Sequence, residues 1–518
     1  MAVAGAPEPV TGRRLQLGLA AAGLFLAALD AYAVVTLLPQ MLAGVDLPVD
    51  HVESAAPILS GFLGGYVVAM PLLGAFSDAR GRLPACAAAL GTFAAGSALT
   101  ALAPSLAPLV AGRALQGLGG GALVPLSLAL AADLYAAGRR GLAVGGVSAL
   151  QEAGSVLGPI YGAGLAAGLG DWRLVFWLNL PLAALILGGL VLSTRRLSPV
   201  VAPAGASAGG QRVEWLGALL LGAGLGLVVL ALYPDDPTSR PVNAHATLFG
   251  IAAALLLVAF GWRQGRLKTP LIRLQLLRRR AFGGSLAANL LAGAALMVAL
   301  VDVPILARGV YELDTFHSGL VLVRFLVGVP AGALLGGWLA GRAGQRASAA
   351  GGMILAAVAF GLMSSWDARA LEVAALPTAA ELAACGFGFG LVIAPLSTAL
   401  LDQARSAEHG VASSLVVLAR TVGMVLALSA LTAFGLARLQ SILAGRRCGV
   451  STGGGSLRDQ LNAYENCVRG ALLQEYHEIF WVAAAICVVA AAVALATLPS
   501  RAAGPATSRS GSRAAVPE

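Results

Sequence analysis

The chain has 518 residues, of which 58% are hydrophobic and only 11% are charged, and its formal net charge is +9. Soluble globular domains carry about 25% charged residues, so this chain has too few charges to cover a water-soluble surface. Composition therefore excludes an ordinary soluble enzyme and favours a protein that crosses a membrane many times. The positive charge does not indicate nucleic-acid binding, because membrane proteins retain basic residues on their cytoplasmic side.

Fourteen apolar stretches of this sequence are long enough to cross a bilayer. The hydrocarbon core of a bilayer is about 30 Å thick and needs about 20 helical residues. Because backbone polar groups in lipid must be bonded within the protein, runs of this length predict helices. The expected spans are 16–41, 54–76, 84–103, 107–134, 140–168, 173–194, 214–233, 244–262, 281–307, 314–340, 346–366, 378–402, 409–440 and 470–498.

The basic residues predict the orientation of these spans. An even number of spans places both termini on one side, and most of the 34 lysine and arginine residues fall on that side. Basic loops stay in the cytoplasm, so we expect a multi-pass protein of the bacterial inner membrane with both termini cytoplasmic. We expect 1–15 to be a cytoplasmic N-terminus and 499–518, rich in Ala, Gly, Ser and Arg, to be a disordered cytoplasmic tail.

Two parts of the chain look like copies of each other. The segment 74–82 after the second span resembles 337–346 after the tenth, and Asp133 with its following arginines resembles Asp402 with Arg405. The repeat predicts an all-α membrane protein with two six-helix bundles, at 16–194 and 281–498. The two remaining spans then form an extra hairpin within a linker at 195–280.

Four motifs follow one another in the N-terminal half. They are a turn of glycine, aspartate and arginine (Gly74, Asp78, Arg80, Gly81 and Arg82), an arginine followed by glutamine and glycines (Arg113 within 113–119), a glycine–proline ladder (Gly154, Gly158, Pro159 and Gly162) and an aromatic segment (171–181). Together they resemble the major facilitator superfamily, in its fourteen-span group of proton-coupled exporters. The resemblance implies a conformational gate at the first motif and antiport at the third. Ala79 departs from the family pattern, which has an arginine there.

Other segments resemble the lipid-exporting branch of this superfamily found in mycobacteria. They are 29–36, 66–74, 151–162, 300–303, 390–397 and 409–420. This resemblance implies export of triacylglyceride or a related lipid, a periplasmic lipoprotein as acceptor, and a monomer driven by the proton gradient without a cofactor. A multidrug–proton antiporter that exports amphipathic cations shares nearly all the motifs and remains an alternative.

Charged residues inside the spans are the candidate functional residues, because a charge at the bilayer centre costs at least about 2.5 kcal/mol. Asp30, Glu152 and Arg420 lie near the middle of their spans. A carboxylate that alternates between paired and unpaired states can take up and release a proton. We predict that Asp30 is a protonation site, that Glu152 is a second one or half of an ion lock, and that Arg420 is the switching cation. Static salt bridges are the alternative.

Three further charged residues have open roles. Arg113 either takes part in proton coupling or bonds nearby backbone carbonyls. Asp302 and Arg324 either pair with each other or line the route of a substrate head group. The basic run 263–280, which contains several leucines, is either an interfacial amphipathic helix on anionic lipid or a loop that sets orientation.

The last two spans are longer than a membrane requires. The segment 408–447 has no proline, and a helix of forty residues is about 60 Å long at about 1.5 Å per residue. We therefore expect the last two helices to project outside the membrane at about 438–470. Cys448 and Cys467 are the only cysteines expected outside, where disulfides are permitted, and are a candidate bridge.

The sequence contains no pattern expected of an enzyme. Its five histidines are isolated from one another, and no nucleophile stands at a recognisable spacing from a base. We therefore expect neither a catalytic site nor a metal site.

Overall fold

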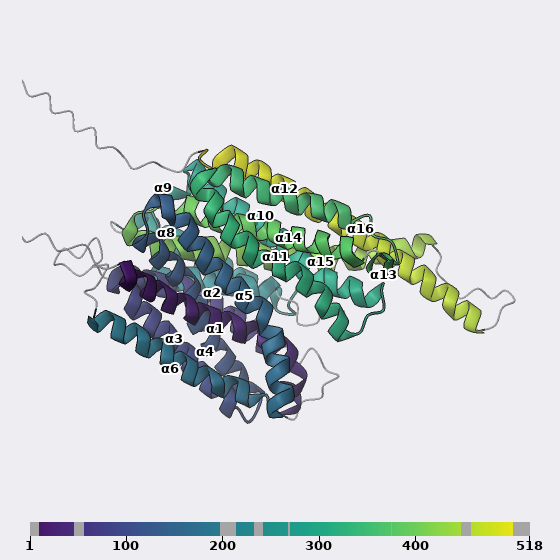
Figure 1. Ribbon diagram of the computed structural model, residues 1–518, viewed down its shortest axis with the longest axis horizontal. Coiled ribbons are helices and arrows are strands. Elements are labelled where there is room, and N and C mark those ends of the chain that lie inside the picture. Colours follow the sequence, from purple (N-terminus) through teal and green to yellow (C-terminus); the bar gives the residue numbers. More distant parts are fainter. Residues whose placement is uncertain are drawn as a thin grey trace, which may run out of the picture.

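The computed structural model describes residues 10–45, 56–196, 214–232, 242–267, 270–373, 375–446 and 457–500. Within these ranges the chain folds into helices joined by short turns, without strands (Figure 1). The fourteen long helices are α1 (Val10–Ala43), α2 (Ala56–Arg80), α3 (Arg82–Leu102), α4 (Leu106–Leu134), α5 (Ala137–Leu169), α6 (Arg173–Arg196), α7 (Trp215–Leu232), α8 (Ala246–Arg266), α10 (Arg280–Gly309), α11 (Thr315–Arg342), α12 (Gln345–Met363), α14 (Ala375–Leu401), α15 (His409–Arg446) and α16 (Leu457–Thr497). Each expected span corresponds to one of them, so the predicted all-α membrane fold is confirmed.

Thirteen of these helices are long and apolar enough to cross a membrane. The fourteenth, α5, has 33 residues, but its glycines, Gln151 and Glu152 lower its hydropathy. It packs along α1 in one half of the molecule and α11 in the other. This helix therefore runs between the two halves and contacts both of them.

Helix packing repeats between the two halves. In the first half α4 packs against α2 and α3, and in the second α14 packs against α11 and α12. Glycines permit both approaches. Gly121 of α4 lies against the Tyr66 carbonyl of α2, and Gly390 of α14 lies against the Val329 carbonyl of α11. A side chain at either glycine would meet that backbone, so the repeated glycines set the spacing of the helices.

The extra hairpin, α7 and α8, packs through α7 against α2 and α15. Ser429 Oγ of α15 donates to the Leu232 carbonyl oxygen at 2.5 Å. The hairpin therefore contacts both halves. The linker segments 197–213 and 233–241 lie outside the described residues.

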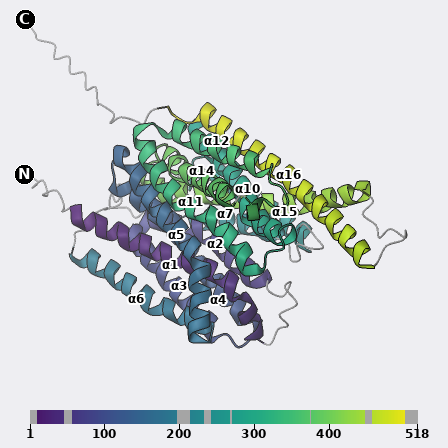
Figure 2. The ribbon, with the colours of Figure 1, turned by 45° about the vertical axis from the view of Figure 1, so that its right-hand side comes forward.

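The last two helices extend beyond the bundle, as predicted. α15 has 38 residues and α16 has 41, which corresponds to about 60 Å each, twice the hydrocarbon thickness of about 30 Å. Figures 1 and 2 show α16 reaching past the other helices, and in Figure 1 it does so at the end opposite to α9 (Leu274–Leu277). Arg438 of α15 donates to Glu478 of α16 through Nε at 2.5 Å and Nη2 at 2.7 Å.

Several expectations fall on parts of the chain outside the described residues. These are the first nine residues, the residues from 501 onwards and the segment 447–456, which contains Cys448. The bridge between Cys448 and Cys467 therefore stays a prediction. Cys86, Cys385 and Cys487 are free and buried, as expected of small packing residues within spans.

Candidate functional site

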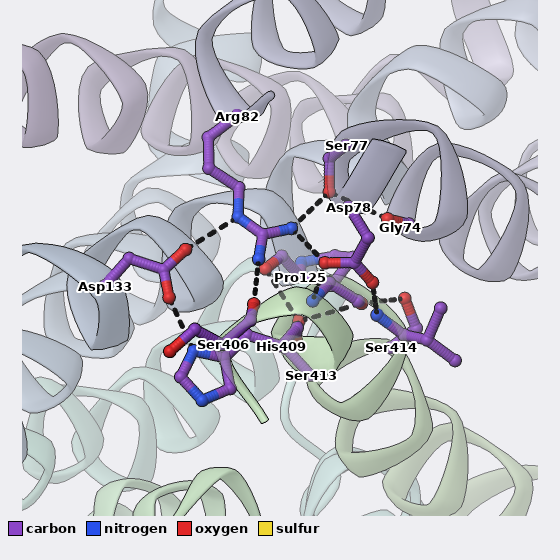
Figure 3. A network of polar contacts seen from close by, with 12 residues as sticks. Gly74, Ser77, Asp78, Arg82, Pro125, Asp133, Ser406, His409, Ser413 and Ser414 are labelled. Atoms are coloured by element: carbon purple, nitrogen blue, oxygen red, sulfur yellow. Dashed lines mark hydrogen bonds and ion pairs between the residues drawn. The ribbon is translucent and has the colours of Figure 1, made fainter. Parts of the chain in front are cut away.

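The two halves meet at a polar gate at the α9 end of the molecule. We use "gate" for Asp78 and Arg82 with their partners in the segment 406–411. The Asp78 carboxylate accepts hydrogen bonds from the backbone N–H groups of Gly410 (2.9 Å) and Val411 (3.0 Å). Arg82 Nη2 donates to the Ser406 carbonyl oxygen at 3.0 Å. These bonds join α2 and α3 to the start of α15 (Figure 3) and hold this end closed.

A buried ionic network supports the gate. Arg82 pairs with Asp78 and, through Nε at 2.8 Å, with Asp133 at the end of α4. The other oxygen of Asp133 lies 2.5 Å from Nδ1 of His409 on α15. Figure 3 shows Arg82 between the two carboxylates. The network thus runs through three helices of the first half and crosses to the second half at His409. Removing one member leaves a buried charge without its partner.

Of the charged residues in the predicted gate motif, Asp78 and Arg82 join the network and Arg80 does not. Arg80 is exposed and has no ion-pair partner among the described residues. Gly81 has φ of 100°, a backbone conformation that favours glycine. It lies directly before α3, which begins at Arg82. A side chain on Gly74 would meet Gly410 and Ser414 of α15, so this glycine permits the halves to touch.

A second set of contacts between the halves closes the same end, at the repeat of the gate motif in the second half. Arg140 of α5 pairs with Asp402 at the end of α14, and Asp402 also accepts from Gln345 Nε2 at 2.7 Å. Gly141 of α5 lies against the Gly337 carbonyl of α11. Sequence reasoning did not assign a closing role to Arg140, Gln345 and Asp402, although the internal repeat contained the signal for it. Gln345 and Asp402 occupy in the second half the positions that Arg82 and Asp133 occupy in the first.

We predict that Asp78→Asn opens the gate. The variant weakens charge-assisted hydrogen bonds to Gly410, Val411 and Arg82, each worth about 1.5–3 kcal/mol. A cysteine at position 413 reports opening, because Ser413 is fully buried and donates to the Pro125 carbonyl oxygen across the interface. Maleimide labelling of that cysteine should become about tenfold faster or more.

The matched control for this prediction is Arg80→Gln, which alters a neighbouring exposed charge outside the network. It should leave the labelling rate at position 413 unchanged. Equal labelling in Asp78→Asn and its parent would show that the Asp78 bonds do not hold the gate closed.

Asp30 lies at the centre of the N-terminal half and pairs with Arg113. Its Oδ2 accepts from Arg113 Nη1 at 2.9 Å and from Gln116 Nε2 at 3.1 Å, and its Oδ1 accepts from Asn179 Nδ2 at 2.6 Å. All four residues are buried. The Arg113 guanidinium also stacks over the Phe62 ring at 4.4 Å. Arg113 therefore contacts the candidate protonation site Asp30, as the first of its two interpretations requires. Sequence reasoning did not identify Asn179 as a partner of Asp30.

Glu152 and Arg420 form a separate pair that joins the two halves. Arg420 Nη1 of α15 lies 3.4 Å from Glu152 Oε1 of α5, and each side chain is 15% exposed. Asp30 does not share this cation. The three charges predicted at similar depth therefore belong to two sites, one inside a single bundle and one between bundles.

A central cavity of about 370 Å³ lies between the halves. Its walls come from α1, α2, α4 and α5 on one side and from α10, α11 and α15 on the other, and most are apolar. Glu152 and Arg420 contribute charge to the wall, together with Arg113, and Tyr32 and Tyr66 lie among the remaining lining residues.

The sequence suggested that Asp302 and Arg324 either pair with each other or line the substrate route. Among the described residues no ion pair joins them. Within that part of the chain, Asp302 Oδ2 and Arg324 Nη1 both lack hydrogen-bond partners. Neither residue lines the central cavity.

The glycine ladder of α5 packs on α1 as a regular groove. A Cβ at Gly154, Gly158 or Gly162 would lie 2.7 Å from the carbonyl oxygen of Phe25, Leu29 or Ala33, respectively. The contacts step four residues along both helices, which is the spacing of one helix face. Pro159 lies within the same helix. Close backbone approach is thus the structural effect of this motif.

We predict that Gly158→Ala destabilises the protein by about 1–3 kcal/mol, as expected for overpacking against backbone. Gly164→Ala on the same helix is the matched control, because a Cβ at that position would have open space within 4 Å. Alanine there should be neutral or stabilising by up to about 1 kcal/mol. Thermal unfolding in detergent measures both. Equal melting temperatures would show that the groove tolerates separation of α1 and α5.

Two duplicated helical bundles, closed at one end around a central cavity, define a membrane transporter rather than an enzyme. The chain belongs to the Major Facilitator Superfamily, which it matches over residues 20–199 and 188–428.

Named relatives agree with this assignment. The chain is 40% identical to the triacylglyceride transporter of Mycolicibacterium smegmatis, over 93% of this chain and 87% of the relative. It is 38% identical to the triacylglyceride transporter of Mycobacterium tuberculosis, over 93% and 94% of the two chains. The human organic anion transporter MFSD10 has the same fold, with a TM-score of 0.59, 19% identity and coverage of 94% of this chain and 100% of that one.

Proposed function

We propose that the protein is a proton-coupled exporter that moves triacylglyceride or a related lipid from the inner membrane toward the periplasm by alternating access. The single observation that carries this proposal is the Glu152–Arg420 pair, which joins the two halves in the wall of an otherwise mostly apolar cavity. The names of the relatives in two mycobacterial genera support lipid as the substrate.

The pair provides a physical means of coupling. Because Glu152 and Arg420 lie on opposite halves, separation of the halves at this depth breaks the ion pair. Two unpaired charges at membrane depth are costly. A proton on Glu152 removes one of those charges and frees Arg420, so proton binding would lower the cost of changing state. The Asp30 carboxylate, which is buried against Arg113, is proposed as another protonation site.

Cavity size limits how a lipid could be held. About 370 Å³ lies at the lower end of the range of about 300–1,000 Å³ that is usual for small-molecule sites. We propose that the cavity takes the glycerol ester region while the acyl chains stay among the surrounding lipids. The same volume suits a drug-sized cation, so the multidrug antiporter remains the second candidate.

The closed gate and the distribution of charge support the proposed direction of transport. The gate end holds exposed arginines such as Arg80 and Arg139, and the positive-inside rule assigns that end to the cytoplasm. With the gate closed, the cavity can open only toward the opposite side of the membrane, where α15 and α16 project. We propose that this projection passes lipid to a periplasmic lipoprotein and that the transporter acts as a monomer.

A transport assay in liposomes tests the proposal. The purified protein is reconstituted with a labelled triacylglyceride or a cationic dye, and a pH gradient is then imposed. Gradient-dependent movement of the lipid, abolished by a protonophore, is the expected result. Movement of the dye without the lipid would assign the protein to the multidrug class, and lipid movement that ignores the gradient would remove proton coupling.

A further inference from the structure

The segment between α8 and α10 docks on the gate helices. Within 270–279 only α9 is helical, so the long amphipathic helix considered from the sequence is not formed there. Ile272 is 7% exposed and belongs to a core cluster with Ala75 of α2 and Val411 of α15. Leu276, 5% exposed, belongs to another with Ala412 of α15. Two apolar anchors therefore fix this segment to the elements that form the gate.

A bidentate ion pair joins the same segment to the residue that precedes α15. Arg273 donates through Nε at 3.0 Å and Nη2 at 2.9 Å to the two oxygens of Glu408. Glu408 is followed directly by His409, which contacts Asp133, and by Gly410, which donates to Asp78. Paired arginine–carboxylate bonds of this kind fix geometry as well as contributing energy. Arg273 thus positions the start of α15.

Gln264 extends the connection to the extra hairpin. Its Oε1 accepts from the backbone N–H groups of Leu271 at 2.6 Å and Ile272 at 3.4 Å, and its Nε2 donates to Glu214 at 3.1 Å. Glu214 in turn pairs with Arg263 of α8. These bonds hold the segment in a defined backbone conformation between the hairpin and the gate.

The outward face of the segment is strongly basic. Arg278, Arg279 and Arg280 are consecutive and exposed, and Leu277 beside them is 43% exposed. In the described part of the chain none of these three guanidinium groups has an acidic partner. Nearby in the sequence, Arg266 stacks at 4.1 Å on Trp262, whose side chain is 62% exposed.

The position of this basic surface indicates which kind of molecule binds to it. It lies at the ends of two membrane-crossing helices, α8 and α10, where lipid head groups are the neighbouring molecules. Exposed arginine with leucine and tryptophan at that depth suits an anionic head group with adjoining acyl chains. The acidic residues bonded to this segment and to its Gln264 contact, Glu408 and Glu214, are already paired with other arginines.

From this arrangement we infer that residues 277–280 bind anionic phospholipid, and that this binding stabilises the closed gate through the Arg273–Glu408 pair. Bound phosphate groups immobilise the end of the segment and thereby keep Arg273 in place on Glu408. The inference concerns only the lipid of the surrounding leaflet, so it holds whether the transported substrate is a lipid or a drug.

The test uses the full chain in nanodiscs of phosphatidylcholine with or without phosphatidylglycerol. Native mass spectrometry measures bound phosphatidylglycerol, and hydrogen exchange of peptides covering 406–416 reports the gate. In the parent protein phosphatidylglycerol should slow exchange of these peptides several-fold. The triple variant Arg278→Gln/Arg279→Gln/Arg280→Gln should bind phosphatidylglycerol with an affinity lower by about tenfold or more. Its gate peptides should also lose the protection by this lipid.

Two further variants separate binding from its effect on the gate. Glu408→Gln should bind phosphatidylglycerol as the parent does, while its gate peptides no longer respond to the lipid. Arg308→Gln, which alters an exposed arginine at the other end of α10, should behave as the parent in both measurements. Raising the salt from 0.1 M to 1 M should remove the effect, since the screening length falls from about 10 Å to about 3 Å.

Three results would overturn the inference. They are unchanged phosphatidylglycerol binding in the triple variant, a gate in the parent protein that does not respond to the lipid, and a gate in Glu408→Gln that still responds. The first would remove the binding surface, and the other two would remove its connection to the gate.

Discussion

Glu152→Gln is expected to abolish gradient-driven transport while leaving the folded protein and its substrate binding intact. Glutamine keeps the size and the carbonyl oxygen of glutamate, so it can still accept from Arg420 across the 3.4 Å gap. It cannot exchange a proton with solvent. Under the proposed mechanism, accumulation driven by a pH gradient should fall by at least about tenfold, because no charge change is left to couple. Substrate counterflow without a gradient should persist.

Two measurements distinguish coupling from a static salt bridge at Glu152. Tracer accumulation is compared with and without a pH gradient, and the melting temperature is measured for the same preparations. Ser155→Ala alters another residue that lines the cavity on α5, and it should retain gradient dependence. A lower melting temperature with gradient dependence preserved would assign Glu152 and Arg420 to fixing the register of the two halves.

Arg113→Met is expected to destabilise the protein more than Gly158→Ala or Glu152→Gln. Asp30 and Arg113 are 1% and 0% exposed, so the variant leaves a carboxylate in the interior without its counter-charge. Breaking a buried pair from one side costs about 3–5 kcal/mol. Thermal unfolding in detergent should show a large fall in melting temperature and a poor yield of folded protein.

The double variant Asp30→Asn/Arg113→Met provides the decisive control for that prediction. Asparagine can still accept from Gln116 and carries no charge, so it should recover most of the lost stability. Arg308→Met, at an exposed position, should have little effect. Equal instability of the single and double variants would show that packing on Phe62, rather than charge, is the contribution of Arg113.

Much of the architecture follows from the sequence because it depends on local composition. Apolar length predicts the helices, and all fourteen are present in the described part of the chain, including α5, which carries Glu152 and several glycines. The absence of proline and strong breaks in 408–447 predicts the length of α15. Glycine spacing along α5 likewise places those glycines on one helix face, because they recur every four residues, whereas only the structure identifies α1 as the helix packed against them.

The partners of the charged residues, by contrast, were decided by the tertiary structure. The sequence placed Asp30, Glu152 and Arg420 at similar depth, yet Asp30 bonds Arg113, 83 residues away, and Arg420 bonds Glu152, 268 residues away. Depth along a helix can be read from the sequence, but the direction in which that helix faces its neighbours depends on how all the helices pack. For the same reason the bond from Gly410 to Asp78, 332 residues apart, has no local signal, and only the folded chain brings the two halves of the gate together.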